Sequence, residues 1–310
     1  MAHLLSAHHL ADVPARWWPV DQILLWYFGA ATLLELALWT RLPDPAGMLF
    51  WHVTGTAVLA LARRFESRGK SVPTLGAAIF YFRHWYPILY VAACYREMSV
   101  LIPAVRSTDA DAALASLDRA IWGADPTVWL ERWHSPMLTE FLQIVYSGFV
   151  PAVLGVAFLL WLQRRYTDFR YYAFLIVLGF LASYIGYMFV PARGPRFLLH
   201  HLQSFELRGL WLYEGLRTTL DRLEKPHFDC FPSGHTEMSI LAWWGSRQIS
   251  PNLARFLFVY TLGVIFATVY LRYHYTVDVV AGAALAGVLI WCAPRFYRAL
   301  GGPAPGGKAA

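Results

Sequence analysis

Apolar residues occur along this chain in long runs, and short polar segments separate the runs. An α-helix needs about 20 mainly apolar residues to cross the ~30 Å hydrocarbon core of a bilayer. Eight runs are candidates for such helices: residues 23–40, 47–62, 76–101, 138–163, 171–192, 235–247, 254–271 and 276–293. The sixth run is short, and a buried half-helix would have the same pattern. The pattern as a whole predicts an all-α fold, a polytopic membrane helical bundle.

Composition favours a membrane protein over a soluble one. The 310-residue chain is 57% hydrophobic and only 15% charged, whereas soluble domains carry about 25% charged residues. Aromatic residues make up 16% of the chain, and Trp and Tyr gather at membrane–water interfaces. A large soluble core with long apolar helices is the alternative, and the length of the uncharged runs argues against it.

Charge and cysteine content bear on two further classes, nucleic-acid-binding proteins and proteins with cysteine metal or redox motifs. The net charge is +6, and Lys and Arg lie between apolar runs rather than in a basic stripe with interleaved aromatics, so we expect no nucleic-acid partner. The three cysteines, Cys94, Cys230 and Cys292, have neither metal-binding nor CxxC spacing. Cys230 is expected to be a small buried filler. The cysteines therefore indicate no metal site, and we expect no cofactor.

Positive charges in the short gaps predict which side of the membrane each gap faces. Lys and Arg gather in alternate gaps, at Arg63, Arg64, Arg68, Lys70, Arg164, Arg165, Arg170, Arg247, Arg255, Arg295 and Arg298. The short gaps opposite, 41–46 and 272–275, carry one Arg each. Because cytoplasmic loops are the Lys- and Arg-rich ones, both termini are predicted to be cytoplasmic. Residues 193–234 would then face the periplasmic or extracytoplasmic side of a plasma (inner) membrane, or the lumen of an endomembrane.

A polar segment, residues 107–137, lies on the same outer side. Its sequence predicts a short helix over Asp109–Leu117. A second helix is expected to begin at Asp125-Pro126, because Pro is favoured in the first turn of a helix. Three Trp side chains suited to a helix lying on the membrane are Trp122, Trp129 and Trp133.

The sixth run opens on Pro232-Ser233-Gly234-His235, a candidate for anion binding and proton transfer. A helix N-terminus offers free backbone N–H groups and a positive dipole to an anion, and Ser233 is a good N-cap. His235 would stand at the mouth of the helix, where it could give a proton to a leaving oxygen. Taken alone, the motif also fits an ordinary N-cap followed by an interfacial His.

His274 and Asp278 form a second candidate pair, at the start of the last run. A spacing of four residues places both side chains on one face of a helix, one turn apart. A carboxylate within reach of an imidazole fixes its tautomer and raises its basicity. Such a His is prepared to act as a nucleophile or base, and ionisable groups at a membrane boundary are functional candidates.

Arg193 and Arg196 stand where the fifth run meets the outer face, and Gly194-Pro195 separates them. Arg binds phosphate oxygens through two parallel hydrogen bonds, and a Gly lets backbone amides approach an anion. The two Arg side chains could therefore clamp an anion. Snorkelling toward lipid headgroups is the alternative.

In this order along the chain, the Arg pair and the two His motifs resemble the type 2 phosphatidic acid phosphatase superfamily. That superfamily also includes vanadium haloperoxidases, glucose-6-phosphatase and fungal inositol phosphorylceramide synthase. Its signatures are Lys-x6-Arg-Pro, Pro-Ser-Gly-His and Ser-Arg-x5-His-x3-Asp. The second is present letter for letter at residues 232–235, and the third in its His274-x3-Asp278 half, followed by Val279-x-Ala281-Gly282.

The chain departs from the remaining signature positions. The Lys of the first signature would fall at Phe189 with Arg196 aligned, or at Gly186 with Arg193 aligned. The Arg of the third would fall at Thr268, and Ala267 takes the place of its Ser. Arg193 and Arg272 are the cations expected to replace those that are lost. The Asp-x-x-Ile-x-Gly-x-Asp-Pro segment that starts at Asp118, and Arg-Tyr-His-Tyr, look most like the inositol phosphorylceramide synthase branch.

The resemblance covers about residues 76–297 and implies three regions. Residues 1–75 would be a cytoplasmic lead and about two extra transmembrane helices. Residues 76–297 would be the catalytic membrane domain with the six-helix core of the superfamily. Residues 298–310, rich in Gly, Pro and Ala, are predicted to be a disordered tail.

The resemblance implies a metal-independent lipid-phosphate phosphatase or phosphotransferase. His274 would attack phosphorus while Asp278 holds its other nitrogen, and His235 would protonate the leaving alcohol. The phosphate-binding residues implied are Arg193, Arg196, Ser233, Gly234 and Arg272. The substrate would be a phosphorylated lipid in the bilayer, and the acceptor either water or an alcohol; transfer of a phosphoinositol-like headgroup is what the synthase branch implies.

Two other functions fit part of the pattern. A lipid transporter or flippase without chemistry also has intramembrane charges, but it carries them deep within the spans and on paired half-helices. The candidate groups of this chain gather at one membrane face instead. A haloperoxidase shares the site residues but has little need of eight spans.

Overall fold

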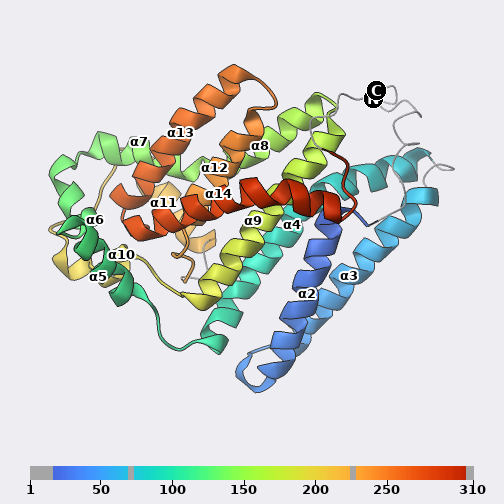
Figure 1. The fold of residues 1–310 in the computed structure, drawn as a ribbon. Helices are drawn as coiled ribbons and strands as arrows, with labels where there is room; N and C mark the ends of the chain where they lie inside the picture. Colours follow the sequence, from blue (N-terminus) through green and yellow to red (C-terminus); the bar gives the residue numbers. More distant parts are fainter. Residues whose placement is uncertain (1–16, 69–72, 224–227, 305–310) are drawn as a thin grey trace.

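The computed structural model describes residues 17–68, 73–223 and 228–304, and within these ranges the protein is all-α (Figure 1). The α-helices are α2 (Pro19–Ala37), α3 (Pro45–Arg68), α4 (Pro73–Val105), α5 (Asp111–Trp122), α6 (Pro126–Trp129), α7 (Pro136–Ser147), α8 (Phe149–Leu162), α9 (Tyr166–Phe189), α10 (Pro195–Leu198), α11 (Tyr213–Leu223), α12 (Gly234–Ser246), α13 (Pro251–Tyr270) and α14 (Thr276–Ala299). Short 3-10 helices lie at Trp39–Arg41, Leu130–Trp133 and His200–Leu202. Most of the predicted cytoplasmic lead and residues 305–310 of the predicted tail lie outside the described residues.

Six of these helices, α2, α3, α4, α9, α13 and α14, are long and apolar enough to cross a membrane, and α7 with α8 forms one further, bent candidate. Each of the eight apolar runs therefore corresponds to a helix or a helix pair. The sixth run is α12, whose 13 residues extend only about 20 Å at ~1.5 Å per residue. The prediction of an all-α polytopic membrane bundle is confirmed.

The fourth predicted span is not one straight helix, which corrects the prediction for residues 138–163. It breaks at Gly148 into α7 and α8, with an angle of 41° between them. Pro151 lies in the first turn of α8 and has no backbone N–H to give to the carbonyl four residues earlier, and its ring would clash with that carbonyl. The break therefore falls where a continuous helix is sterically unfavourable.

The polar segment 107–137 differs from its prediction in its boundaries. The first helix begins at Asp111 instead of Asp109 and continues to Trp122, where Gly123 takes a left-handed φ of 72°. The second helix does begin at Pro126, with Asp125 as N-cap. The three Trp side chains expected at the membrane interface are 63%, 41% and 51% exposed, at Trp122, Trp129 and Trp133 respectively.

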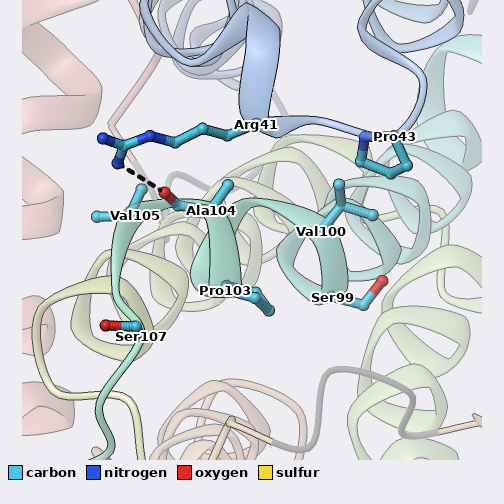
Figure 2. Close-up of a pocket in the computed structure, with 8 residues that line it drawn as sticks. All are labelled: Arg41, Pro43, Ser99, Val100, Pro103, Ala104, Val105 and Ser107. Atoms are coloured by element: carbon cyan, nitrogen blue, oxygen red, sulfur yellow. Dashed lines mark hydrogen bonds between the residues drawn. The ribbon is translucent and has the colours of Figure 1, made fainter.

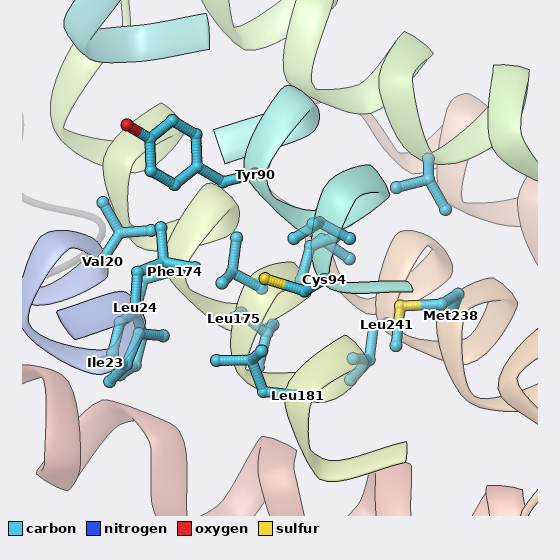
Figure 3. Close-up of a cluster of buried hydrophobic side chains, with 14 of the residues drawn as sticks. Val20, Ile23, Leu24, Tyr90, Cys94, Phe174, Leu175, Leu181, Met238 and Leu241 are labelled. Carbon is cyan, nitrogen blue, oxygen red and sulfur yellow. The ribbon is translucent and has the colours of Figure 1, made fainter. Parts of the chain in front are cut away.

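The core of the bundle lies between α2, α4, α9 and α12 (Figure 3). Leu175 of α9 and Met238 and Leu241 of α12 are fully buried there, next to Cys94 of α4. Helix α12 also contacts α8, α13 and α14, so it is surrounded by other helices. This position explains how a helix too short to cross a bilayer alone can be held within the bundle.

We call the end of the bundle where α9 ends and α12 and α14 begin the site end. Helix α4 also ends there, because the backbone N–H of Ala110 donates to the carbonyl of Pro191 at 2.7 Å. A cavity of about 530 Å³ lies at this end between the α2–α3 connection and the last turns of α4, and includes Arg41, Pro43 and Pro103 (Figure 2). At the opposite end, the start of α2 meets the end of α14, where Gln22 Nε2 donates to the carbonyl of Leu300 at 2.9 Å.

A buried ion pair joins α2 to α4 near that opposite end. Arg83 Nη1 lies 2.8 Å from both carboxylate oxygens of Asp21, and both residues are fully buried. The hydroxyl of Tyr86 donates to Asp21 Oδ1 at 2.5 Å. A buried charge is tolerated when it is paired and hydrogen-bonded, so this pair fixes the two helices against each other.

Candidate active site

The Pro-Ser-Gly-His motif forms the N-terminus of α12, as predicted. Ser233 is the N-cap, and its side chain accepts a hydrogen bond from the backbone N–H of Thr236 at 3.3 Å. Its own backbone N–H donates to the carbonyl of Asp278 at 3.0 Å. This approach requires Gly282 on α14, because a Cβ atom there would collide with the Ser233 carbonyl. The motif is thereby packed directly against the first turns of α14.

His274 and Asp278 do not share a helix, which corrects the geometric argument for their pairing. Helix α14 begins at Thr276, so His274 lies in the preceding loop and Asp278 in the first turn. The loop folds back, and the backbone N–H of His274 donates to the carbonyl of Thr268 at 3.1 Å. The two side chains are close all the same, with 3.6 Å between Nδ1 of His274 and Oδ2 of Asp278.

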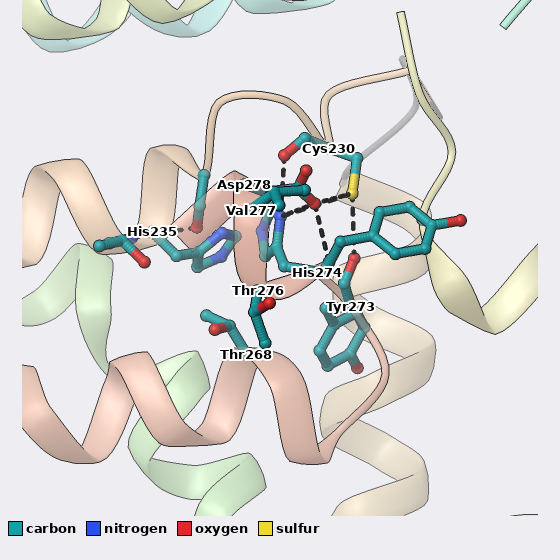
Figure 4. Close-up of polar contacts among 12 residues, drawn as sticks. Cys230, His235, Thr268, Tyr273, His274, Thr276, Val277 and Asp278 are labelled. Atoms are coloured by element: carbon teal, nitrogen blue, oxygen red, sulfur yellow. Dashed lines mark hydrogen bonds and ion pairs between the residues drawn. The ribbon is translucent and has the colours of Figure 1, made fainter. Parts of the chain in front are cut away.

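The hydrogen bond that fixes the imidazole of His274 goes to a backbone group. Nδ1 of His274 lies 2.9 Å from the carbonyl oxygen of Cys230 (Figure 4). A carbonyl can only accept, so Nδ1 carries the proton and Nε2 has the free lone pair. The carboxylate of Asp278 stands just behind, where it stabilises positive charge on the ring.

Cys230 has a larger part in the site than the sequence indicated. Its Sγ donates to Oδ2 of Asp278 at 2.9 Å, and the same oxygen accepts the backbone N–H of Tyr275 at 2.8 Å. Burial, followed by the nearby charge of Asp278, raises the pKa of the Cys230 thiol well above its usual value. The residue is therefore a neutral S–H donor that orients Asp278. In the sequence, the only indication of this role was its position close to the Pro-Ser-Gly-His motif.

His235 faces His274 across the site, with 5.7 Å between the ring centroids (Figure 4). The ring of Tyr146 stacks on it at 4.1 Å, and the Tyr146 hydroxyl lies 3.3 Å from Nδ1 of His235. Phe149 packs on the same imidazole at 4.2 Å. The His235 ring is thus held between α7, α8 and α12, and it meets the His274 ring at an interplanar angle of 60°.

The two Arg residues after α9 are held by their backbone. The N–H groups of Arg193 and Gly194 each donate to the carboxylate of Asp111 at 2.7 Å. Gly194 has φ 102°, and a Cβ atom there would lie 2.6 Å from the Tyr273 carbonyl, so only Gly fits. Arg193 is exposed and lies over the ring of Phe197. The chain therefore turns sharply toward the His274 loop.

Arg196 and Arg272 have acidic partners. Nη1 of Arg196 pairs with Asp221 at 2.6 Å, and the guanidinium also lies over the Tyr273 ring. Arg272 is buried, has φ 66°, and pairs with Glu131 at 2.8 Å. Its Nη1 donates to Gln203 and to the carbonyl of Phe205, both at 2.9 Å. The structure brings Arg193 and Arg196 to the site cavity but leaves Arg272 and Ser233 outside its lining.

Two carboxylates of α5, seven residues apart, position the site and were not assigned a role from the sequence. Asp111 binds the Arg193-Gly194 backbone and the Tyr275 hydroxyl. Asp118 accepts the backbone N–H groups of Thr276 at 2.8 Å and Val277 at 3.0 Å, and so caps α14 from outside. In the sequence, the indication of this role was their spacing, which puts both carboxylates on one buried face of an amphipathic helix.

The candidate groups line one end of a cavity of about 420 Å³. That end contains the side chains of Arg193, Arg196, His235, His274 and Asp229. The remainder lies between α4, α8 and α9 and is apolar and aromatic, including Trp85, Ile88, Val150, Leu154, Ile176 and Phe180. The cavity therefore joins a polar, cationic end to an apolar body.

Cys230, His274 and Asp278 also have metal-ligand atoms within 4.8 Å of one another. In this arrangement the atoms are bonded within the protein, because Nδ1 of His274 is taken by a carbonyl and the thiol by the carboxylate. A metal ion at this place would have to break both hydrogen bonds. The donor set therefore fits a hydrogen-bonded relay better than an ion site.

Comparison with known proteins decides the family. The family model described as PAP2 superfamily matches residues 112–292, more than half of the chain. The chain belongs to the PAP2 superfamily. The match begins in α5 and ends in α14, so it contains every predicted site residue, and α2, α3 and α4 precede it.

A PA-phosphatase related-family protein of Dictyostelium discoideum is 31% identical over 124 residues, which is 36% of this chain and 22% of the relative. The chain thus spans less than a quarter of the length of this relative. No solved structure gives a significant match. The resemblance to the PAP2 superfamily is confirmed, while its inositol phosphorylceramide synthase branch is distinguished by neither match.

Proposed function

We propose that this protein is an integral membrane enzyme that cleaves or transfers phosphate esters of lipids through a phosphohistidine formed on His274. The observation that carries the proposal is the pair His274 and His235, 5.7 Å apart at the polar end of a cavity with an apolar body. Membership of the PAP2 superfamily supports it, since that family implies phosphatase-type chemistry on lipid phosphates.

In the first step, Nε2 of His274 attacks phosphorus and the bond to the leaving oxygen breaks. The Nδ1 proton stays on the ring, held by the Cys230 carbonyl, and Asp278 stabilises the positive charge that develops. His235 gives its proton to the leaving alcohol oxygen. In the second step, His235 takes a proton from water or an alcohol, whose oxygen attacks phosphorus and releases His274.

Negative charge grows on the equatorial phosphate oxygens, so the site needs fixed donors. Arg193 and Arg196 line the cavity and are the proposed guanidinium contacts. Gly234 also lines it, at the N-terminus of α12, where backbone N–H groups favour an anion. Ser233 acts through the cap that forms this N-terminus. Arg272 remains in the proposed phosphate-binding set from sequence, although its contacts in the structure favour a positioning role.

The apolar body of the cavity supports a lipid substrate. Its lining from α4, α8 and α9 would take up part of an acyl chain, while the phosphate lies against the cationic end. A phosphorylated lipid satisfies both ends at once, whereas a small soluble phosphate would leave the apolar body empty. This supports a substrate presented by the bilayer, on the outer leaflet if the predicted topology holds.

Asp229 favours transfer to or from a hydroxyl-rich alcohol as the finer form of the proposal. Its carboxylate lines the cavity beside the two His residues, and Tyr95 donates to Oδ2 at 2.5 Å. A carboxylate repels phosphate but accepts hydrogen bonds from hydroxyl groups. A phosphoinositol-like headgroup has a phosphate group for the two Arg side chains and hydroxyl groups for Asp229. Hydrolysis by water remains the simpler reaction of the same site.

The experiment is a lipid-resolved assay of the purified protein in detergent with EDTA. Phosphatidic acid and a phosphoinositol lipid with an added diacylglycerol or ceramide acceptor are supplied, and phosphate release and headgroup transfer are followed together. We expect turnover of at least one substrate, loss of turnover in His274→Asn, and normal turnover in His200→Asn, an exposed His on the same side of the bundle. Full activity of His274→Asn would overturn the nucleophile assignment.

The role of His235 is tested with two leaving groups. His235→Asn should lose most of its activity on a lipid phosphate, but much less on an aryl phosphate, whose leaving group needs no proton. Equal losses on both substrates would contradict the general-acid role. Lipid movement between leaflets without turnover of any phosphate ester would instead identify a transporter.

A further inference from the structure

A second cluster of ionisable side chains lies within the N-terminal helices, separate from the candidate active site. Glu35 of α2, His52 of α3 and Glu97 of α4 meet there, one residue from each helix. These three residues are 0%, 2% and 7% exposed, in that order. Charged groups in a membrane span are expensive and mark functional sites by default, and the proposed reaction makes no use of these three.

The imidazole of His52 lies between the two carboxylates. Its Nε2 is 2.9 Å from Oε1 of Glu97, and its Nδ1 is 3.4 Å from Oε2 of Glu35. One potential ligand atom from each of the three residues lies within 4.8 Å of the others. Two atoms bound to one tetrahedral ion at 2.0–2.2 Å lie about 3.3–3.6 Å apart, so His52 Nε2 and Glu97 Oε1 need to separate by only about half an ångström to bind one ion.

The atoms that face away from the cluster centre are held by neighbouring hydroxyl groups. The hydroxyl of Tyr27 donates to Oε2 of Glu97 at 2.8 Å. The hydroxyl of Thr32 lies 2.9 Å from Nδ1 of His52. If Thr32 accepts from Nδ1–H, the lone pair of Nε2 points toward Glu97. Ligands of metal ions are commonly oriented by such outer hydrogen bonds.

The atoms that face the centre have no hydrogen-bond partner among the described residues. This holds for both carboxylate oxygens of Glu35, for Nε2 of His52 and for Oε1 of Glu97. Although Nε2 and Oε1 are 2.9 Å apart, their geometry is not that of a hydrogen bond. A buried carboxylate without a donor is strongly unfavourable, so these atoms point to a cation between them.

We propose that Glu35, His52 and Glu97 bind a divalent transition-metal ion, with Zn²⁺ as the best match. Two carboxylates and one neutral imidazole carry two negative charges, which a divalent cation neutralises. Imidazole suits Zn²⁺ better than Mg²⁺ or Ca²⁺, and Zn²⁺ also accepts Glu oxygens. The ion would join α2 and α3 to α4.

A path for the ion is present at the site end. A cavity of about 390 Å³ is lined by Glu97 together with Asp44, Trp51 and Arg96. Asp44 adds a second carboxylate to this lining, which favours a cation. The same helix that supplies Glu97 also supplies Tyr95 and Arg96 to the substrate cavity. The ion therefore fixes the position of α4 beside that cavity without contacting the substrate.

The experiment measures metal bound to the full-length protein in detergent. Protein is stripped with a chelator, reloaded with Zn²⁺, freed of excess ion and analysed for metal by mass spectrometry. We expect about one Zn²⁺ per chain and a melting temperature several degrees higher with Zn²⁺ than after stripping. Wild-type protein that retains no Zn²⁺ and melts at the same temperature either way would overturn the proposal, and the cluster would then hold protons instead.

Matched variants locate the ion. Glu35→Gln and His52→Gln should each lower the bound Zn²⁺ and abolish its effect on melting, because each removes one ligand. Glu214→Gln removes an exposed carboxylate of α11 and should change neither. Zn²⁺ content equal to wild type in both cluster variants would contradict the assignment. If a variant does not fold, the stripping and reloading of wild-type protein still decides whether an ion is bound.

Discussion

At the scale of single residues, the state of His274 is set by groups that contact it from three chain segments. The Cys230 carbonyl accepts a hydrogen bond from Nδ1–H, Asp278 lies 3.6 Å from the same nitrogen, and the Thr268 carbonyl accepts the backbone N–H of His274. Because the carbonyl fixes the tautomer by itself, the carboxylate is left to stabilise charge. Changes to the side chain of Cys230 should therefore affect the rate through Asp278 and not through the tautomer.

The Cys230 thiol gives the first prediction at this scale. Cys230→Ala removes the S–H donor to Asp278 but keeps the backbone carbonyl, so kcat should fall about two- to tenfold, the equivalent of ~0.5–1.5 kcal/mol. Cys230→Ser retains a donor and should stay near wild type. Because the thiol is buried and its pKa is raised, it should resist alkylation in the folded protein. A loss as large as that of His274→Asn would mean that Cys230 itself reacts.

Arg193 and Arg272 give contrasting predictions. Arg193→Ala should lower kcat/KM by about 10² with little change in melting temperature, because it removes a donor to the transition state. Arg272→Ala should lower the melting temperature, because it leaves Glu131 and the 203–205 loop without their shared partner. Rates are compared per folded molecule. An Arg272→Ala variant that melts like wild type but loses about 10² in rate would identify Arg272 as a phosphate contact.

The sequence led to the reactive residues because their motifs are local and spaced along one segment. His235, His274 and Asp278 were placed together by pattern and resemblance, and the structure brings them together. The supporting residues could not be found this way. Asp111 and Asp118 contact residues more than 80 positions later in the chain, and nothing in the local pattern encodes such a partner.

At the scale of secondary-structure elements, α5 connects two separate chain segments of the site end. One face of this helix is buried and binds the turn after α9 through Asp111 and the start of α14 through Asp118. Its other face is exposed and carries Ala113 and Ser116, whereas Trp122, one turn after Asp118, donates from Nε1 to the Thr276 hydroxyl at 2.8 Å. A carboxylate at the N-terminus of α14 satisfies free N–H groups and favours the helix dipole. The helix therefore fixes the distance between the Arg turn and the His274 loop.

Removing the cap that α5 gives to α14 tests this role. Asp118→Ala should lower stability by ~1–2 kcal/mol, as loss of an N-cap does, and lower kcat about tenfold or more, because His274 and Asp278 shift. Asp109→Ala, an exposed carboxylate just before α5, is the matched control and should change neither. Melting curves and lipid-phosphate turnover provide the two measurements. An Asp118→Ala variant with wild-type kcat would show that α14 keeps its position without α5.

Helices were predicted more completely than the breaks within them. Long apolar runs specify a spanning helix by length alone, which is why each run corresponds to one helix or helix pair. The break at Gly148 depends on Pro151 and on packing against α9 and α12, and the run of apolar residues continues across it. The helix over Asp111–Trp122 extends beyond its predicted end because Gly123, rather than Leu117, can take the left-handed terminal conformation.

At the scale of the whole molecule, the candidate site and the basic segments lie at opposite ends of the bundle. The site end holds the α2–α3 connection, the end of α4 and helices α5, α6, α10 and α11 (Figure 1). The other end joins α8 to α9 and α12 to α13, where Arg165 donates to the carbonyl of Gln248 at 2.5 Å. These basic segments therefore lie away from the candidate site, and the membrane face of each end stays a prediction from the loop charges.

Labelling of single introduced cysteines tests which end faces outward. Because Lys- and Arg-rich short loops remain in the cytoplasm, Ser204→Cys at the site end should react with an impermeant thiol reagent in intact cells, and Gln163→Cys after α8 should react only after lysis. Both positions are exposed, and the wild-type protein, with two buried cysteines and one half-buried, gives the background. The reverse pattern would place His235 and His274 on the cytoplasmic side, so that the lipid phosphate would reach them from the inner leaflet and the charge rule would fail for this chain. Labelling of both positions in intact cells would require an even number of crossings between them, and would contradict a single crossing of the membrane by α9.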